Sequence, residues 1–182
     1  MSNTQVKTGE VRFSYVHVFE PQEGQDGGRL KYSTAILIPK SDTKTIAALQ
    51  AAQKAAIAEG KAKDSKFKPS RVPLRDGDTD PSKEGDALYA GHYFLNASAN
   101  ENRKPQVIDE TRTKLLTSED EFYSGCYGRA VLSFYAYDNV SKGVACGLEA
   151  IQKLRDGERL GGKRVDAFDA FADDEDSDDM LF

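Results

Sequence analysis

Aromatic and cationic side chains recur together in those segments of this 182-residue chain that have the pattern of β-strands. Aromatic rings can stack on nucleobases, and Lys and Arg can contact phosphates, so the two kinds of side chain together allow sequence-independent binding of a single nucleic-acid strand. Any single ring could instead pack in the core, so the prediction depends on the whole set. The candidate stacking residues are Phe13, Tyr15, Tyr32, Phe94, Tyr135 and Tyr137, and the candidate phosphate contacts are Lys66, Lys68, Arg71, Arg103, Lys104 and Arg129.

Residues for catalysis or metal binding form no comparable set. The two histidines, His17 and His92, both lie in strand-like segments. The chain has no GxxxxGK[ST], GxGxxG, HExxH or GxSxG motif. Acidic groups such as Asp76 with Asp78, or residues 119–121, lie in polar loops and are expected to be solvated. The sequence therefore predicts a protein that is not an enzyme and that uses no metal or cofactor.

Composition indicates one domain followed by a tail, because 182 residues are too few for two ordinary domains. Charged residues make up 30% of the chain, its mean hydropathy is −0.61, and no apolar run approaches the roughly 20 residues that span a bilayer. Residues 1–10 are polar and lack the apolar stretch of a signal peptide, so a cytoplasmic location is expected. Cys126 and Cys146 are predicted to be small, reduced thiols rather than a zinc site or a disulfide.

The last seventeen residues, 166–182, contain eight acidic side chains and no basic one, and they end on the apolar triplet 180–182. The rest of the chain, residues 1–165, contains 22 acidic and 25 basic residues, so this body has a net charge of +3. Blocks of like charge are usually solvated interaction tails. Such a tail could serve only solubility, or it could compete with nucleic acid for a basic surface, and Phe182 could fill a partner's pocket.

The elements that must position these residues begin with a strand at 11–19 and a second strand at 31–39, which together are expected to form a hairpin with a long loop. An alanine-rich helix follows, with Ser41 as its N-cap and Gly60 at its end. Ile46, Leu49 and Gln53, with Ala56 or Ile57, form one stripe, so the helix is predicted to pack on the sheet.

The second half of the chain is predicted to be mostly β-structure. Residues 61–75 are a basic stretch and 76–86 a polar loop, and strands at 91–99 and 106–109 flank a turn. Residues 127–138 alternate a small apolar face with an aromatic and cationic face. Residues 144–154 are compatible with a strand or a helix, and the turn at 139–143 favours a strand. Residues 155–165 resemble a Gly-rich linker.

These elements predict a mainly β fold: an OB-fold-like five-stranded barrel with an inserted α-helix and a disordered acidic C-terminal tail. A β-sandwich fits the same strands almost as well. The expected domains are an OB-fold body at 1–165 and an interaction tail at 166–182.

Four segments also match a known family: KYSTAILIPK at 31–40, PLRDGD at 73–78, YSGCYGRAVLSFYAYD at 123–138 and KGVACGLEAIQKLRDGERLGG at 142–162. In these segments, their order and the acidic tail, the chain resembles the phage-encoded single-stranded DNA-binding (helix-destabilising) proteins of tailed bacteriophages. The resemblance implies an OB-fold that coats single-stranded DNA in phage replication and recombination. The tail departs from cellular single-strand binding proteins because it ends in DDMLF without a proline, and the chain has no tryptophan.

The resemblance further implies that the tail shields the DNA-binding groove and contacts replication proteins such as DNA polymerase or helicase. The tail residues predicted to bind these partners are Asp173, Asp174, Glu175, Asp176, Asp178, Asp179 and Phe182. Two other classes stay open: an acidic-tailed interaction protein or chaperone for basic proteins, and a nucleic-acid-processing enzyme, which would need a metal site. The sequence leaves the oligomeric state open, with a homodimer among the alternatives, and predicts no membrane partner.

Overall fold

The computed structural model describes residues 3–24, 28–139, 141–161 and 167–172 of the chain. The tail residues predicted to bind partners, 173–182, lie outside the described residues, as do 162–166. The described strands are β1 (Gln5–Lys7), β2 (Val11–Glu23), β3 (Leu30–Pro39), β4 (Arg75–Asp76), β5 (His92–Asn100), β6 (Gln106–Ile108), β7 (Tyr127–Asp138) and β8 (Lys142–Arg155). The helices are α1 (Thr43–Lys63), the 3-10 turn η1 (Pro81–Lys83) and the short α2 (Ala167–Ala170).

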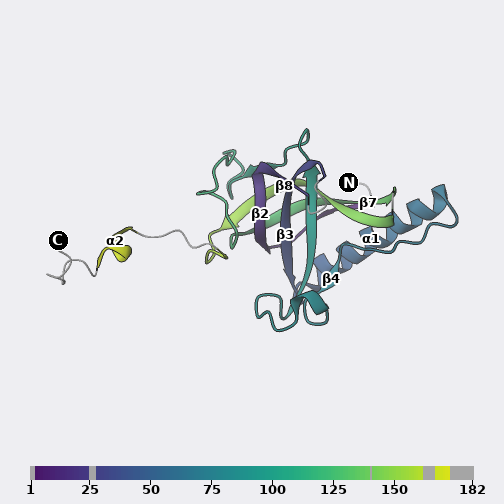
Figure 1. The fold of residues 1–182 in the computed structure, drawn as a ribbon, viewed down its shortest axis with the longest axis horizontal. Helices are drawn as coiled ribbons and strands as arrows, with labels where there is room; N and C mark the ends of the chain where they lie inside the picture. The colour runs from purple at the N-terminus through teal and green to yellow at the C-terminus, as the bar shows by residue number, and fades with distance from the viewer. Residues whose placement is uncertain (1–2, 25–27, 140, 162–166, 173–182) are drawn as a thin grey trace.

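Five of the strands close into a barrel. β2 pairs with β3, β3 with β5, β8 with β7, and β7 with β2, all antiparallel, while β5 and β8 are parallel. The ring β2-β3-β5-β8-β7 is the small Greek-key barrel of the OB-fold, so the predicted five-stranded barrel is confirmed. The β7–β8 hairpin extends beyond β2 and β3, which cross it (Figure 1).

The barrel interior holds the main core. The alternation predicted for residues 127–138 is confirmed: Ala130, Leu132 and Phe134 of β7 are buried, whereas Tyr135 is exposed. The apolar centre of β3 is buried on both faces. Ile36 and Ile38 join the main core, and Leu37 packs in a second cluster with the rings of Tyr89 and Phe94, because residues 77–91 fold over the outside of the barrel there.

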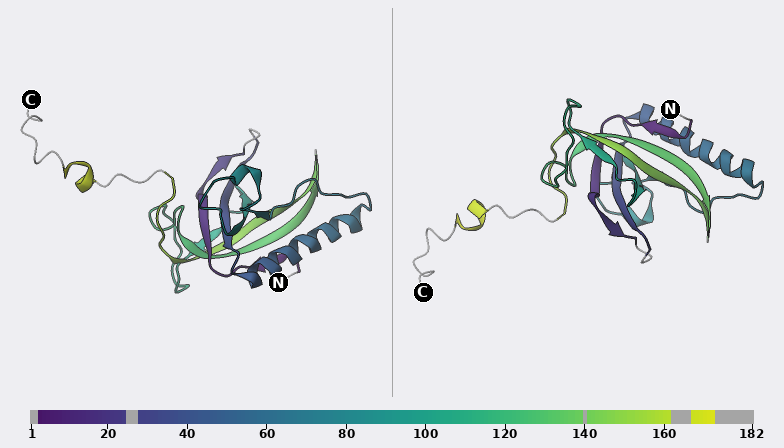
Figure 2. Two further views of the ribbon diagram at one scale, coloured as in Figure 1. Left: turned by 90° about the horizontal axis from the view of Figure 1, so that it is seen from below. Right: turned by 90° about the horizontal axis from the view of Figure 1, so that it is seen from above.

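Helix α1 packs against β7, as the apolar stripe predicts, and lies along one side of the β7–β8 hairpin with β2 and β3 on the other (Figure 2). Its N-cap is Asp42, not Ser41, because the Asp42 carboxylate accepts a hydrogen bond from the Thr45 backbone N–H at 3.1 Å. The helix also continues past Gly60 to Lys63. Gly60 is needed for close packing instead, since a Cβ there would lie 2.7 Å from the Phe67 ring.

The ambiguous segment 144–154 is a strand, because β8 pairs with β7 along its whole length and buries alternate side chains. Two short strands extend the sheet outside the barrel: β1 pairs with β7, and β6 pairs with β8. β6 confirms the short strand predicted at 106–109, whereas β1 has too short a pattern to be recognised in the sequence. Among the described residues, no helix has the length and apolar character needed to cross a membrane.

Candidate nucleic-acid interface

One row of directly paired residues crosses all five barrel strands on the outer surface. His17 of β2 lies opposite Ser33 of β3, Ser33 opposite Ser98 of β5, Ser98 opposite Gly147 of β8, and Gly147 opposite Ser133 of β7. We call these five residues the transverse row. None of them is buried. Because four of the five have no side chain larger than a hydroxymethyl group, the row forms a low floor that curves round the barrel, with a contour of about 19 Å at roughly 4.8 Å per strand.

Tyr15 stands at the β2 end of the transverse row in an unusual backbone conformation. Ser14 is paired with Ala35 and His17 with Ser33, so β2 has one extra residue in a β-bulge between them. Tyr15 has a φ of 48° and a ring that is 64% exposed. A non-glycine residue in the left-handed region costs about 1 to 3 kcal/mol, and the exposed ring makes little packing contact to offset it. The bulge therefore turns the ring outward to solvent.

One cation, in an otherwise acidic loop, lies beside Tyr15. Lys83, the single basic residue of 76–91, places its ammonium nitrogen 6.0 Å from the centre of the Tyr15 ring and 4.3 Å from that of Tyr89. A cavity of about 360 Å³ opens here, lined by Tyr15, His17, Leu88 and Tyr89 among others. A lone lysine in a polar loop gives no signal in the sequence, so Lys83 was not among the predicted phosphate contacts.

Ion pairs fix the loop that carries Lys83. The Arg75 guanidinium donates to both carboxylate oxygens of Asp80, at 2.6 and 2.8 Å, and this pairing lowers the pKa of Asp80 from 3.8 to about 2. The Lys40 ammonium lies 2.8 Å from Asp76 and 2.7 Å from Asp78. Asp76 and Asp78 thus both pair with Lys40. In the described ranges, no group of three or more His, Cys, Asp and Glu side chains could hold a metal ion.

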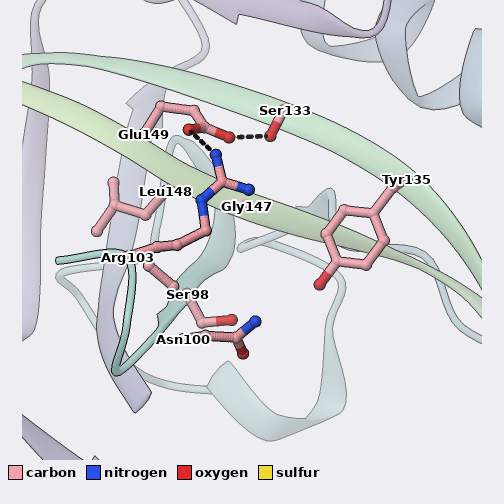
Figure 3. A pocket seen from close by; sticks show the side chains of 9 residues that line it. Ser98, Asn100, Arg103, Ser133, Tyr135, Gly147, Leu148 and Glu149 are labelled. Atoms are coloured by element: carbon pink, nitrogen blue, oxygen red, sulfur yellow. Dashed lines mark hydrogen bonds and ion pairs between the residues drawn. The ribbon is translucent and has the colours of Figure 1, made fainter. Parts of the chain in front are cut away.

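A second cavity, of about 330 Å³, lies at the other end of the transverse row (Figure 3). Tyr135 flanks it with a ring that is 45% exposed. Arg103, from the turn after β5, lies 3.5 Å from a carboxylate oxygen of Glu149, whose other oxygen accepts a 2.7 Å hydrogen bond from Ser133. Arg103 and Lys104 are both exposed, in the turn where the sequence predicts them.

Three predicted stacking residues are wrong as contacts, because they are buried. Phe13 is fully buried and packs edge-on against Phe122, with ring centres 5.1 Å apart. Phe94 is 1% exposed, and Arg75 lies 5.0 Å above its ring. Tyr32 is 7% exposed. These rings offer no free face to a base, and the sequence did not separate them from Tyr15 and Tyr135 because all are aromatic residues in strands.

The remaining predicted residues lie farther along the β7–β8 hairpin. Lys66, Lys68 and Arg71 are exposed. The backbone of Arg71 forms an isolated β-bridge with Gly143 near the hairpin tip. Tyr137 is half-buried at the same tip, where a Cβ at Gly143 would meet its ring. The basic stretch therefore lies next to the Tyr135 end of the hairpin.

Arg129 lies on the outer face of β7, four residues before Ser133 in the transverse row. Its guanidinium donates a 2.8 Å hydrogen bond to the Thr8 carbonyl and is half-buried. Arg129 therefore ties the segment before β2 to β7 through its Nε–H. A phosphate contact of Arg129 would use the terminal N–H groups, because a guanidinium has five N–H donors.

The sequence and fold both match characterised proteins. A family model described as Enterobacter phage Enc34, ssDNA-binding protein, matches residues 4–181. The chain belongs to this family. Putative protein p50 of Acyrthosiphon pisum secondary endosymbiont phage 1 is 39% identical to this chain over 176 residues, and the match covers 92% of each sequence.

Solved structures of the Enc34 single-stranded DNA-binding protein have the same fold. Its complex with ssDNA matches with a TM-score of 0.72 and 25% identity, covering 88% of this chain and 91% of that one. Its C-terminal truncation matches with a TM-score of 0.70 and 28% identity, covering 87% and 90%. The single-stranded DNA-binding protein gp2.5 of bacteriophage T7 shares the fold, with a TM-score of 0.61, 16% identity and 93% of each chain covered.

Proposed function

We propose that this Enc34 family protein binds single-stranded DNA without sequence dependence along the transverse row, as a non-catalytic coating protein in phage DNA replication and recombination in the host cytoplasm. The observation that carries the proposal is the low floor of small residues, with an exposed tyrosine and a cation at each end. The family match and the ssDNA complex of the Enc34 protein support the same ligand.

Each end of the row would supply one stacking ring and one phosphate contact. Tyr15 and Lys83 form the first pair, and Tyr135 and Arg103 the second. Stacking of a base on an aromatic ring contributes about 1 to 3 kcal/mol and tolerates every base, because every base has a π-face. Lys66, Lys68 and Arg71 would extend the path along the hairpin tip for longer strands.

Fluorescence titration of the full chain with dT oligomers of graded length tests this proposal. We expect affinity to increase with length until both tyrosines are occupied, and to fall steeply with salt because bound phosphates release counterions. A blunt duplex of the same length is the control and should bind more weakly, because its bases stay stacked inside the helix and cannot stack on the tyrosines. Absence of binding to dT oligomers at low salt, with and without residues 166–182, would contradict the proposal.

The acidic tail is proposed to compete with DNA for this groove. The chain before it is held close to Tyr15: the Leu160 N–H donates a 2.9 Å hydrogen bond to the Ser124 carbonyl, and Leu160 and Gly161 line the Tyr15 cavity. A polyanion that begins five residues further along the chain, at residue 166, could reach the cations that DNA would use. Truncation after Val165 should raise affinity for dT oligomers most at low salt, where screening is least. Equal affinities at every salt concentration would reject the competition.

The end of the tail is proposed to bind replication proteins such as DNA polymerase or helicase. The aromatic ring of Phe182, which follows the carboxylates of the tail, suits a pocket with a nearby cation. Deletion of Phe182 alone should weaken capture of the phage polymerase or helicase while leaving dT affinity unchanged. Replacement of Phe182 by Tyr, which keeps the ring, is the matched control, and unchanged capture by the deletion variant would reject this role.

A further inference from the structure

The cavity at the Tyr135 end of the transverse row contains a carboxylate, which is unexpected in a groove for a polyanion. The Glu149 side chain is 32% exposed and lines this cavity together with Tyr135, Ser98 and Asn100. A phosphate placed against Glu149 would be repelled, because like charges at contact distance disfavour each other. Arg103 could hold a phosphate on its own side of the ion pair, which leaves the open side of Glu149 for a group other than phosphate.

A second β-bulge directs Glu149 into the cavity. Val131 of β7 is paired with Ala150, and the next residue, Leu132, with Leu148, so Glu149 is the extra residue of β8. Bulges of this kind re-aim a side chain and are common at functional sites. Tyr15 at the other end of the row is presented by a bulge as well. The barrel thus uses one irregularity at each end of the same floor.

The carboxylate is held in place, and the space in front of it is open. Ser133 donates to one carboxylate oxygen at 2.7 Å, and Arg103 approaches the other at 3.5 Å. Gly147 leaves room, since a Cβ there would lie 2.8 Å from the Ser133 hydroxyl and 3.7 Å from Glu149. The side chains of Ser98, Asn100 and Tyr135 surround the same space, as Figure 3 shows.

A nucleobase has the chemistry that fits this arrangement. Cytosine and adenine carry an exocyclic amino group, which donates hydrogen bonds, whereas thymine has a carbonyl oxygen at the equivalent position of the pyrimidine ring. Bases of a single strand expose these pairing edges to side chains. A carboxylate accepts a hydrogen bond from an amino group and is repelled by the two carbonyl oxygens that flank the single N3–H donor of thymine. With the base stacked on Tyr135, its edge would face Glu149.

We propose that this cavity is a base-reading subsite, in which Glu149 accepts a hydrogen bond from the exocyclic amino group of cytosine or adenine and disfavours thymine. The inference rests on the proposed function and adds a composition preference to it. One such subsite in an otherwise sequence-independent groove should favour an amino-bearing base by about five- to tenfold, the low end of the range for one base-edge contact.

The test compares homopolymers of dT and 5-methyl-dC, which share the methyl group and differ only at the pairing edge. Affinities of the full chain are measured at one salt concentration, at the shortest length that binds. We expect tighter binding of 5-methyl-dC, and we expect Glu149→Gln to bring the ratio of the two affinities close to one, because an amide can donate to thymine as well as accept from cytosine.

The matched control is Glu101→Gln, which removes the same charge from an exposed residue of the turn after β5, outside the lining of this cavity. Glu101→Gln should raise both affinities slightly and keep their ratio. Equal affinities of the unsubstituted protein for the two oligomers would overturn the inference, as would an unchanged ratio in Glu149→Gln. Failure to bind either oligomer would contradict the proposed function itself.

Discussion

Phe13 and Tyr15 are two residues apart on β2, yet the Phe13 ring is fully buried in the barrel and the Tyr15 ring is 64% exposed on its surface. Residues at this spacing share a face in a regular strand. The bulge between Ser14 and His17 reverses that relationship, because one extra residue exchanges the inner and outer faces of the strand. Tyr15 therefore lies at the transverse row, whereas Phe13 supports the core.

Tyr15→Gly should weaken DNA binding without weakening the fold. Loss of one stacked base costs about 1 to 3 kcal/mol, or roughly 5- to 150-fold in affinity for dT oligomers. Glycine adopts the left-handed φ of this position without strain, which offsets its extra chain entropy, so the free energy of unfolding should stay the same or rise. Urea denaturation and dT titration measure the two quantities.

Tyr15→Phe retains the ring and should bind as the unsubstituted protein does. If it bound as poorly as Tyr15→Gly, stacking would not be the role of Tyr15.

Phe13→Leu should have the opposite effect, because its ring packs against Phe122 inside the barrel. Removing a few buried carbons should lower the free energy of unfolding by about 1 to 2 kcal/mol. The affinity of the folded protein for dT oligomers should change by less than about twofold, since no DNA contact is lost. Thermal unfolding and titration at 10 °C separate the two effects. A large loss of affinity in a protein that is still folded would show that Phe13 becomes accessible to bases.

Lys83→Gln and Arg103→Gln should each reduce the salt dependence of DNA binding. Every phosphate contact to a single strand contributes about 0.7 to the slope of log affinity against log salt concentration. Each substitution should therefore make the slope shallower by about that amount. Lys54→Gln is the matched control, because Lys54 is an exposed lysine of α1 and lies outside the basic stretch 61–75. Slopes equal to that of the control would remove Lys83 or Arg103 from the phosphate contacts.

The loop of residues 75–91 should lose stability at acidic pH. Pairing with Arg75 lowers the pKa of Asp80 from 3.8 to about 2. A carboxylate with a lowered pKa in the folded state stabilises that state above its unfolded value, and this contribution is lost as the pH falls from about 4 through 2. Asp80→Asn should therefore lower the free energy of unfolding at pH 7 and have no effect below pH 2. Glu84→Gln, at an exposed position of the same loop, is the control. Equal losses at pH 7 and pH 2 would show that the ion pair is not responsible.

Local patterns in the sequence were sufficient for the longer elements and for a mainly β fold. The alternation of residues 127–138 and the alanine-rich run after Ser41 reflect the periods of strands and helices, which depend on near neighbours in the chain. The set of strands and the single helix then restricted the architecture to a small barrel or a sandwich. The aromatic and cationic residues, together with the charge of the tail, pointed to single-stranded DNA from composition alone.

Only the tertiary structure decided which of those residues share a surface. Strand pairing brings His17, Ser98 and Ser133 into one row, although they are far apart in the chain. One bulge exposes Tyr15, and the other directs Glu149 into its surface cavity. Both depend on the register in which β2 and β8 pair with their neighbours, and the pattern of a single strand does not contain that register. The sequence therefore determined the chemistry available to the protein, and the register of the closed barrel determined which side chains can use it, because pairing between distant strands sets the face on which each residue lies.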